Sequence, residues 1–185
     1  MIDDVLLGTE NRMNKSLDAL KRELASIRTG RASPNIVEHV RVDYYGSPTP
    51  IQQIAGVSIP DSRTILIQPW DRAALGAIEK AILKSDLGLN PANDGSVIRL
   101  PVPPLTEERR KDLVKVVHSR VEEGRVALRN VRRDALEELR KLEKNKEVSA
   151  DEEKRAQDKL QKLTDGFITE AEKIGKYKES ELIES

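Results

Sequence analysis

Apolar residues recur at steps of three and four near both ends of the chain, and this spacing predicts long amphipathic helices. The first stripe ends near Thr29-Gly30, where Gly30 suits a helix C-cap and Pro34 opposes continuation. A second helix is expected from Thr106 to about Lys146. A third follows the capping box at residues 149–152 and carries its stripe to Ile174. Because none of these helices can bury its stripe alone, the three are expected to pack together with coiled-coil-like crossing.

Between the first and second stripes the pattern changes to short β-branched and alternating runs, which predict strands. Strands are expected over residues 36–45, 54–59, 64–67 and 96–100, with turns at 46–50 and 61–63 and a loop at 90–95. A short helix should begin at Asp71 and close at Gly88.

The order of these elements predicts an α+β fold with two domains. Residues 1–30 and 105–185 are expected to form the long three-helix bundle, and residues 31–104 an inserted small β/α domain. Two short connections near 30–34 and 101–105 join them, and few contacts can cross such a junction. A hinge is therefore predicted there, at Gly30, Arg31, Pro34, Pro103 and Pro104.

Composition agrees with thin helical structure, since 35% of the residues are charged and 3% are aromatic. The absence of cysteine excludes disulfides and thiolate zinc sites and fits a reducing cytoplasm. The acidic N-terminal segment is unlike a secretory signal, and no stretch approaches the roughly 20 apolar residues of a membrane span. The sequence therefore predicts a cytoplasmic protein that does not engage a membrane.

One segment, RVALRNVRRDALEELRK at residues 125–141, crowds arginines into a chain whose 32 basic and 32 acidic residues cancel. At about 100° per residue its five arginines fall within an arc of roughly 100° beside the apolar stripe, although Glu122 and Leu136 interrupt that arc. The five are Arg125, Arg129, Arg132, Arg133 and Arg140.

Two interpretations of this arc remain open. It is either a solvated face with intrahelical pairs such as Arg133–Glu137, each contributing a few tenths of a kcal/mol, or a phosphate-binding face. Arginine is suited to the second role because its fork donates two hydrogen bonds to phosphate oxygens. Arg28 and Arg31 form a second basic group where the first helix ends. Such arginines would position RNA rather than read its bases.

Other chemistry is weakly represented in the sequence. His39 and His118 lack partners at metal-ligand spacing, and residues 90–95 do not supply the ligands of a calcium loop. No glycine-rich phosphate loop, nucleophile motif or carboxylate pair is evident, so no catalytic residue, cofactor or metal is predicted. The run Arg109-Arg110-Lys111 lies where cations oppose the helix dipole, and it is either a partner site or a solvated first turn.

Several segments taken together resemble the bacterial ribosome recycling factor family. The family's motifs are matched in order by IRTGRASP at 27–34, YYG at 44–46, LGLNP at 87–91, PPLTEERR at 103–110, VRRDA at 131–135 and QKLTD at 161–165. The resemblance covers the whole chain.

This resemblance implies an L-shaped, non-enzymatic monomer, similar in outline to a tRNA, with a flexible elbow between the bundle and the small domain. It implies binding to the post-termination ribosome and, with elongation factor G and GTP, splitting of the subunits for a new round of translation. The bundle would contact large-subunit rRNA across the aminoacyl and peptidyl sites, and the small domain and elbow would face elongation factor G. By the same resemblance Arg132 is the principal rRNA contact, surrounded by Arg28, Arg31, Arg129 and Arg133, with Arg110 and Arg125 as candidates for additional contacts.

A competing class of function is a helical protein-interaction scaffold or co-chaperone with no RNA role. Its apolar stripes would grip another protein, and the arginines would serve solubility. The two classes differ in salt dependence, because RNA binding falls steeply as salt rises whereas apolar groove binding does not.

Overall fold

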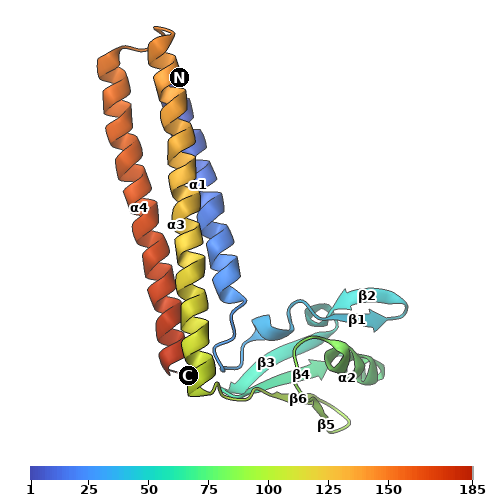
Figure 1. Cartoon of the computed structure of the whole chain (residues 1–185). Coiled ribbons are helices and arrows are strands. Elements are labelled where there is room, and N and C mark those ends of the chain that lie inside the picture. The colour runs from blue at the N-terminus through green and yellow to red at the C-terminus, as the bar shows by residue number, and fades with distance from the viewer. Residues whose placement is uncertain (185) are drawn as a thin grey trace. The chain divides into compact units, whose positions relative to one another are not determined.

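The computed structural model describes residues 1–184. It consists of two compact units, one formed by Met1–Ile27 with Lys111–Glu184 and the other by Arg28–Arg110. Long helices make up the first unit, and a small β/α arrangement makes up the second (Figure 1). The predicted α+β fold, a three-helix bundle with a smaller β/α domain inserted in its sequence, is confirmed.

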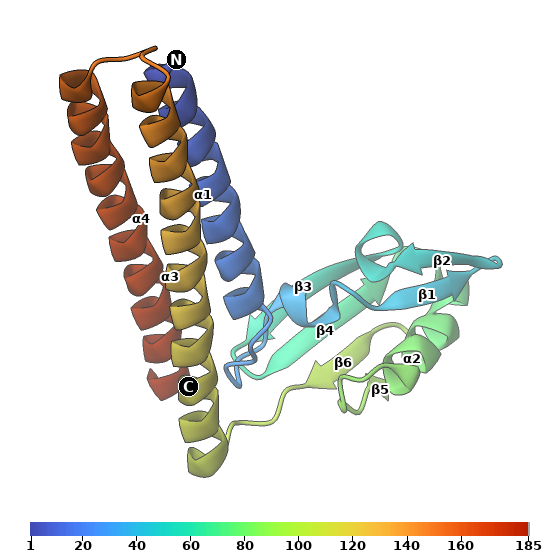
Figure 2. The ribbon, with the colours of Figure 1, turned by 45° about the horizontal axis from the view of Figure 1, so that its top comes forward.

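The bundle helices are α1 (Ile2–Ala25), α3 (Glu107–Lys144) and α4 (Ala150–Glu184), which run alongside one another in Figures 1 and 2. The first turn of α3 groups with the second unit, and the rest of the helix belongs to the bundle. The predicted stripes are buried, and all three helices contribute to one apolar cluster. That cluster contains Ala135 and Leu139 of α3 and Ala156 and Leu160 of α4, with Ile2, Val5 and Leu6 of α1 packed against it.

Two glycines lie at close contacts between helices of the bundle. A Cβ at Gly124 of α3 would lie 3.2 Å from Leu20 Cδ2 of α1, and a Cβ at Gly175 of α4 would lie 2.5 Å from Val121 Cγ2 of α3. Glycine inside a helix costs about 1 kcal/mol relative to alanine. At these positions it lets a branched side chain of the neighbouring helix approach the backbone, so that packing offsets the cost.

The connection between α3 and α4 has defined capping interactions at both ends. Lys146 adopts a left-handed conformation (φ 60°), and the amides of Lys146 and Glu147 donate to the carbonyls of Glu143 and Leu142 in a Schellman arrangement. The predicted capping box is confirmed, since the Glu152 amide donates to Ser149 Oγ at 3.1 Å and the Ser149 amide to Glu152 Oε1 at 3.4 Å. Helix α4 therefore starts where the sequence indicates, and it continues beyond Ile174 to Glu184.

The second unit contains two antiparallel sheets and helix α2 (Leu75–Lys84). A hairpin joins β1 (Arg41–Tyr44) and β2 (Ser47–Pro50), and the larger sheet has the order β3-β4-β6-β5. The strands of that sheet are β3 (Ala55–Asp61), β4 (Thr64–Pro69), β5 (Ala92–Asn93) and β6 (Ile98–Pro101). Short 3₁₀ segments cover Pro34–Val37, Ile51–Gln53 and Arg72–Ala74. The core includes Ile65 and Ile67 of β4, Ile98 and Leu100 of β6, and Ile78 and Ile82 of α2.

Two expectations for the start of this unit are wrong. The strand expected over residues 36–45 begins at Arg41, because Ser33 Oγ accepts from the Asn35 amide and Pro34 starts a 3₁₀ turn instead. The turn expected at 46–50 is strand β2. The chain reverses at Tyr45-Gly46, where both residues have positive φ (52° and 80°), and Pro48 and Pro50 are tolerated because β2 is an edge strand.

Two helices also end earlier than their expected glycine caps. Helix α1 ends at Ala25 and α2 at Lys84, whereas Gly30 and Gly88 follow in the next loops with φ of 75° and 66°. A serine follows each helix directly, and its hydroxyl donates at 2.6 Å to a carbonyl of the last turn, from Ser26 to Glu23 and from Ser85 to Ile82. These hydroxyls satisfy terminal carbonyls before either glycine is reached.

The loop expected at 90–95 contains the two-residue strand β5.

None of the helices in residues 1–184 has the length and apolar character needed to cross a bilayer.

Candidate nucleic-acid interface

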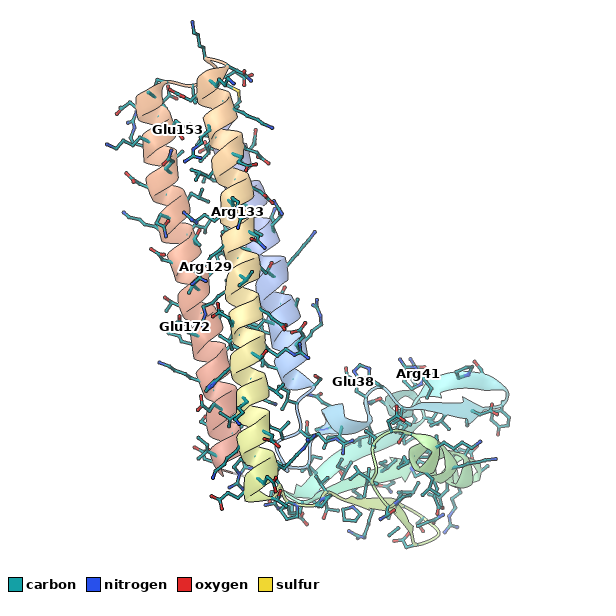
Figure 3. All side chains as sticks on the ribbon, in the orientation of Figure 1. Glu38, Arg41, Arg129, Arg133, Glu153 and Glu172 are labelled. Atoms are coloured by element: carbon teal, nitrogen blue, oxygen red, sulfur yellow. The ribbon has the colours of Figure 1, made fainter. Side chains whose placement is uncertain are left out.

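The five arginines of residues 125–140 lie along one side of α3, and we call them the arginine flank. Figure 3 shows Arg129 and Arg133 on α3 with Glu172 on the adjacent α4. Asp134 points the other way, since its Oδ2 lies 3.0 Å from Arg12 Nη2 of α1. Asp134 therefore lies on the side of α3 that borders α1, away from the arginine flank.

Arg125 is held by two carboxylates. Its Nη2 lies 2.8 Å from Glu122 Oε2 one turn earlier, and its Nη1 lies 3.2 Å from Glu172 Oε1 of α4. Hydrogen bonding to Glu122, followed by Coulombic attraction to Glu122 and contact with Glu172, raises the pKa of Arg125 despite partial burial. With 26% of the side chain exposed, Arg125 is largely neutralised and braces α3 against α4.

Arg132 has a neutral partner. Its Nη1 donates to Gln161 Oε1 of α4 at 3.1 Å, and the residue is half-buried. Gln161 Nε2 in turn donates to Asp165 Oδ1 at 2.8 Å, one turn further along α4. The guanidinium of Arg132 is therefore oriented by an amide oxygen that carries no formal charge.

The remaining members of the flank are more exposed. Arg129 Nη1 lies 3.6 Å from Glu122 Oε1, a long contact with 52% of the side chain exposed. Arg133 Nη2 donates to Asn130 Oδ1 at 3.0 Å, rather than to Glu137 as the solvated-face interpretation expected. Arg140 is exposed. Glu122, which interrupts the predicted arc, is thus the residue that pairs with Arg125 and Arg129.

Arg28 and Arg31 belong to the second unit. Arg28 Nη1 donates to the carbonyl oxygen of Leu87 at 2.7 Å, and Arg31 is exposed. Arg110 also belongs to this unit and is half-buried. The basic residues singled out in the sequence therefore divide between the two units, with the flank in the bundle.

The turn between β3 and β4 bonds to Gly30 of the expected hinge and to two residues next to it, Ala32 and Val102. The Ala32 amide donates to Ser62 O at 2.8 Å, and the Val102 amide to Arg63 O at 2.7 Å. The Arg63 guanidinium donates to the carbonyl oxygen of Gly30. The sequence predicted only an ordinary turn at residues 61–63. The hydrogen-bond partners of this turn lie about 30 to 40 residues away along the chain, so local pattern does not reveal them.

Gly30 itself sits in a confined position. A Cβ there would lie 3.0 Å from the Leu105 amide nitrogen, and φ is 75°. Glycine suits this site because it tolerates positive φ and brings no side chain. Pro34 opens its 3₁₀ turn, and Pro103 and Pro104 are exposed.

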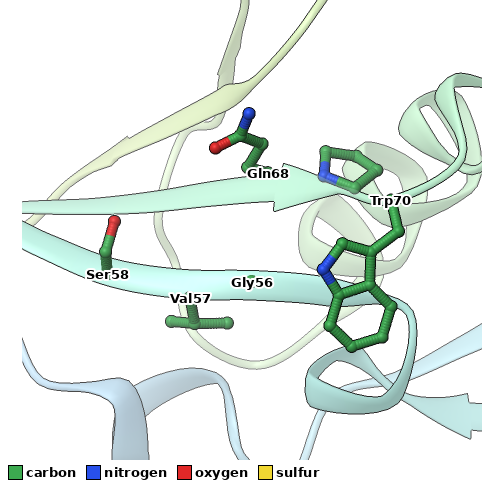
Figure 4. Close-up of a pocket in the computed structure, with 6 residues that line it drawn as sticks. Gly56, Val57, Ser58, Gln68 and Trp70 are labelled. Carbon is green, nitrogen blue, oxygen red and sulfur yellow. The ribbon is translucent and has the colours of Figure 1, made fainter.

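Trp70 is a further surface feature, one that sequence reasoning did not single out. It is 71% exposed, and it lines a pocket with Gly56, Val57 and Ser58 of β3 and Gln68 and Pro69 of β4 (Figure 4).

His118 Nε2 lies 3.1 Å from Glu179 Oε2 across the bundle. Within residues 1–184, no three acidic or histidine side chains are grouped as a metal site.

Comparison with known proteins identifies the family. A family model described as ribosome recycling factor matches residues 20–183. A ribosome-recycling factor of Dehalococcoides mccartyi (strain CBDB1) is 59% identical over 182 residues, covering 98% of each chain. One of Oleidesulfovibrio alaskensis is 56% identical over 183 residues, covering 99% of this chain and all of the relative.

Solved structures agree with the sequence relatives. The solution structure of a ribosome recycling factor aligns with a TM-score of 0.80 at 46% identity, covering all of this chain and 98% of that one. A second match has a TM-score of 0.67 at 51% identity and covers 98% of both chains. It comes from models of the T. thermophilus ribosome recycling factor and E. coli elongation factor G bound to the E. coli post-termination complex. This chain belongs to the ribosome recycling factor family.

Proposed function

We propose that this chain binds the post-termination ribosome and, with elongation factor G and GTP, separates it into subunits for a new round of translation. The observation that carries the proposal is the match over 98% of both chains to a recycling factor that is described with elongation factor G on the post-termination complex. The chain acts in the cytoplasm as a monomer and is not an enzyme, and GTP hydrolysis belongs to its partner. The scaffold alternative lacks such support.

The arginine flank is the proposed contact with large-subunit rRNA across the aminoacyl and peptidyl sites. Arg132 is the principal residue, Arg129 and Arg133 flank it, and Arg28 and Arg31 add contacts from the second unit. Several guanidinium groups on one side of a stiff helix suit phosphates held at fixed positions in folded RNA. Arg125 is assigned to bracing the bundle, because Glu122 and Glu172 occupy its guanidinium.

The hinge is proposed to bend beside the residues that the β3–β4 turn holds. Gly30 and Ala32 on one connection and Val102 on the other are bonded to residues 62–63, so they move with the second unit. Bending then concentrates between the end of α1 and Arg28 on one connection and beyond Val102 on the other, where Pro103 and Pro104 precede α3. Arg31 and Pro34 move with the second unit, and the bundle stays on the rRNA while elongation factor G pushes the small domain.

Binding to purified large ribosomal subunits over a series of salt concentrations tests the rRNA contact. Arg132→Ala should weaken binding and reduce the slope of log K against log salt by about 0.7 to 0.9, the loss of one phosphate contact. Arg120→Ala is a matched control, because Arg120 lies on the same helix outside the flank and pairs with Glu123. Binding that does not change with salt, or equal losses in the two variants, would contradict the proposal and favour the scaffold.

A further inference from the structure

We infer that Gln161 is a positioning residue for Arg132, and that Asp165 sets the orientation of the Gln161 amide. The inference rests on the proposed function, because it explains how one member of the flank is prepared for an RNA phosphate. The residues that carry it form a short chain of hydrogen bonds from α3 to α4, Arg132 to Gln161 to Asp165.

The two neighbours of Gln161 determine which way its amide faces. A guanidinium can only donate hydrogen bonds, and an ionised carboxylate can only accept them. The Gln161 oxygen must therefore face Arg132 and the NH₂ group must face Asp165, which is the arrangement at 3.1 Å and 2.8 Å. A reversed amide would place two donors together and two acceptors together. Asp165 thus keeps the oxygen directed at Arg132.

The contact leaves a phosphate-binding edge of Arg132 available. The hydrogen bond to Gln161 uses Nη1. Within residues 1–184, the Arg132 side chain makes no other hydrogen bond. The opposite edge, formed by Nε and Nη2, presents the two parallel donors that bind a phosphate through two oxygens. One edge of the guanidinium is fixed, and the other makes no hydrogen bond to residues 1–184.

Arg125 shows what a charged partner does instead. Two carboxylates surround it, and its exposed fraction is 26%. An acidic partner at Arg132 would orient the guanidinium equally well but would cancel the charge that attracts RNA. A neutral amide provides orientation without that cost. The two arginines are seven residues apart on α3, so the same helix side combines a bracing and a binding position.

Pre-orientation should appear as a modest gain in affinity. Immobilising a long side chain on binding lowers affinity by roughly 2- to 10-fold, and a side chain already fixed in the free protein avoids part of this loss. The expected effect of removing Gln161 is therefore smaller than that of removing Arg132. It should also depend entirely on Arg132.

The experiment measures binding of the full chain to purified large ribosomal subunits for Gln161→Leu, Arg132→Ala and the double variant. Gln161→Leu should weaken binding roughly 2- to 10-fold with an unchanged salt slope, because the number of phosphate contacts stays the same. In the Arg132→Ala background it should have no further effect. Gln161→Glu should reduce the salt slope, because it neutralises Arg132.

Gln157→Leu is the matched control. Gln157 also pairs with an acid one turn away on α4, donating to Glu153. Its replacement should leave binding unchanged. If Gln161→Leu binds as tightly as the parent, or if its effect persists without Arg132, the positioning role is wrong while the proposed function stands. If Arg132→Ala itself binds normally, the proposed rRNA contact fails, and the positioning role fails with it.

Discussion

The arginines of α3 carry the same charge but have different partners, and those partners assign them different roles. Arg125 lies between Glu122 and Glu172, Arg132 bonds to a neutral amide, and Arg133 bonds to Asn130. The sequence predicted that these side chains share one side of the helix, because position follows from about 100° per residue. It could not predict Gln161 or Glu172 as partners, because the rotation of α4 depends on packing between helices.

Arg125→Ala should lower the free energy of unfolding by about 1 kcal/mol, because it removes the interhelical pair with Glu172 and leaves Glu122 only its long contact with Arg129. It should change affinity for large subunits little. Urea unfolding followed by circular dichroism measures the stability. Arg133→Ala is the control and should cost less than 0.5 kcal/mol, since its bond to Asn130 lies on one helix surface. Equal losses in the two variants would contradict the bracing role of Arg125.

Gly175→Ala should destabilise the bundle by about 1–3 kcal/mol. The added Cβ would lie 2.5 Å from Val121 Cγ2, so α3 and α4 must separate or shift. Gly166→Ala on the same helix meets nothing within 4 Å and should instead gain up to about 1 kcal/mol of helix propensity. Thermal unfolding of both variants measures the difference. A stabilised Gly175→Ala variant would show that this close approach does not constrain the bundle.

At the scale of elements, the long helices could be predicted and the short elements only in part. A stripe repeated over α3 or α4 outweighs local irregularity, and the Ser149–Glu152 capping box locates a helix start from sequence alone. Residues 36–40 have β-branched composition, but Ser33 and Pro34 impose a 3₁₀ turn. Residues 47–50 contain two prolines, which suggested a turn, yet they pair as an edge strand. Local capping decided the first case and strand pairing the second.

Arg63→Ala should loosen the connection at Gly30. The side chain is the donor to the Gly30 carbonyl, and its loss removes about 0.5–1.5 kcal/mol of hydrogen bonding. Amide hydrogen exchange at Ala32 should accelerate by up to about tenfold, while exchange in β6 should stay unchanged. Arg72→Ala, which removes a contact to Ser96 elsewhere in the unit, is the control. Unchanged exchange at Ala32 would show that the β3–β4 turn does not secure this connection through Arg63.

At the scale of the whole molecule, the proposed mechanism needs a bundle that stays on rRNA and a small domain that moves. The α+β class could be predicted because helical stripes at both ends enclose a strand-rich middle section. The hydrogen bonds from the β3–β4 turn to both connections could not be predicted, because they join residues that are distant in the chain. The proposed position of the hinge therefore depends on these tertiary hydrogen bonds as well as on the prolines and glycine.

Locking the hinge should separate binding from splitting. The chain has no cysteine, so introduced cysteine pairs with one member in each unit can be screened for efficient disulfide closure. The oxidised form should bind large subunits nearly as well as the parent and lose subunit splitting. The reduced form of the same variant is the control and should recover splitting. An oxidised form that still splits would remove the hinge from the mechanism.

Light scattering by purified post-termination ribosomes measures subunit dissociation and so tests whether this chain splits ribosomes. With elongation factor G and GTP present, the wild-type chain should dissociate the ribosomes, and omission of any one component should abolish the change. Arg132→Ala should fail at the same concentration while Arg120→Ala succeeds. Intact ribosomes after addition of the wild-type chain and both partners, or equal splitting by Arg132→Ala, would contradict the account.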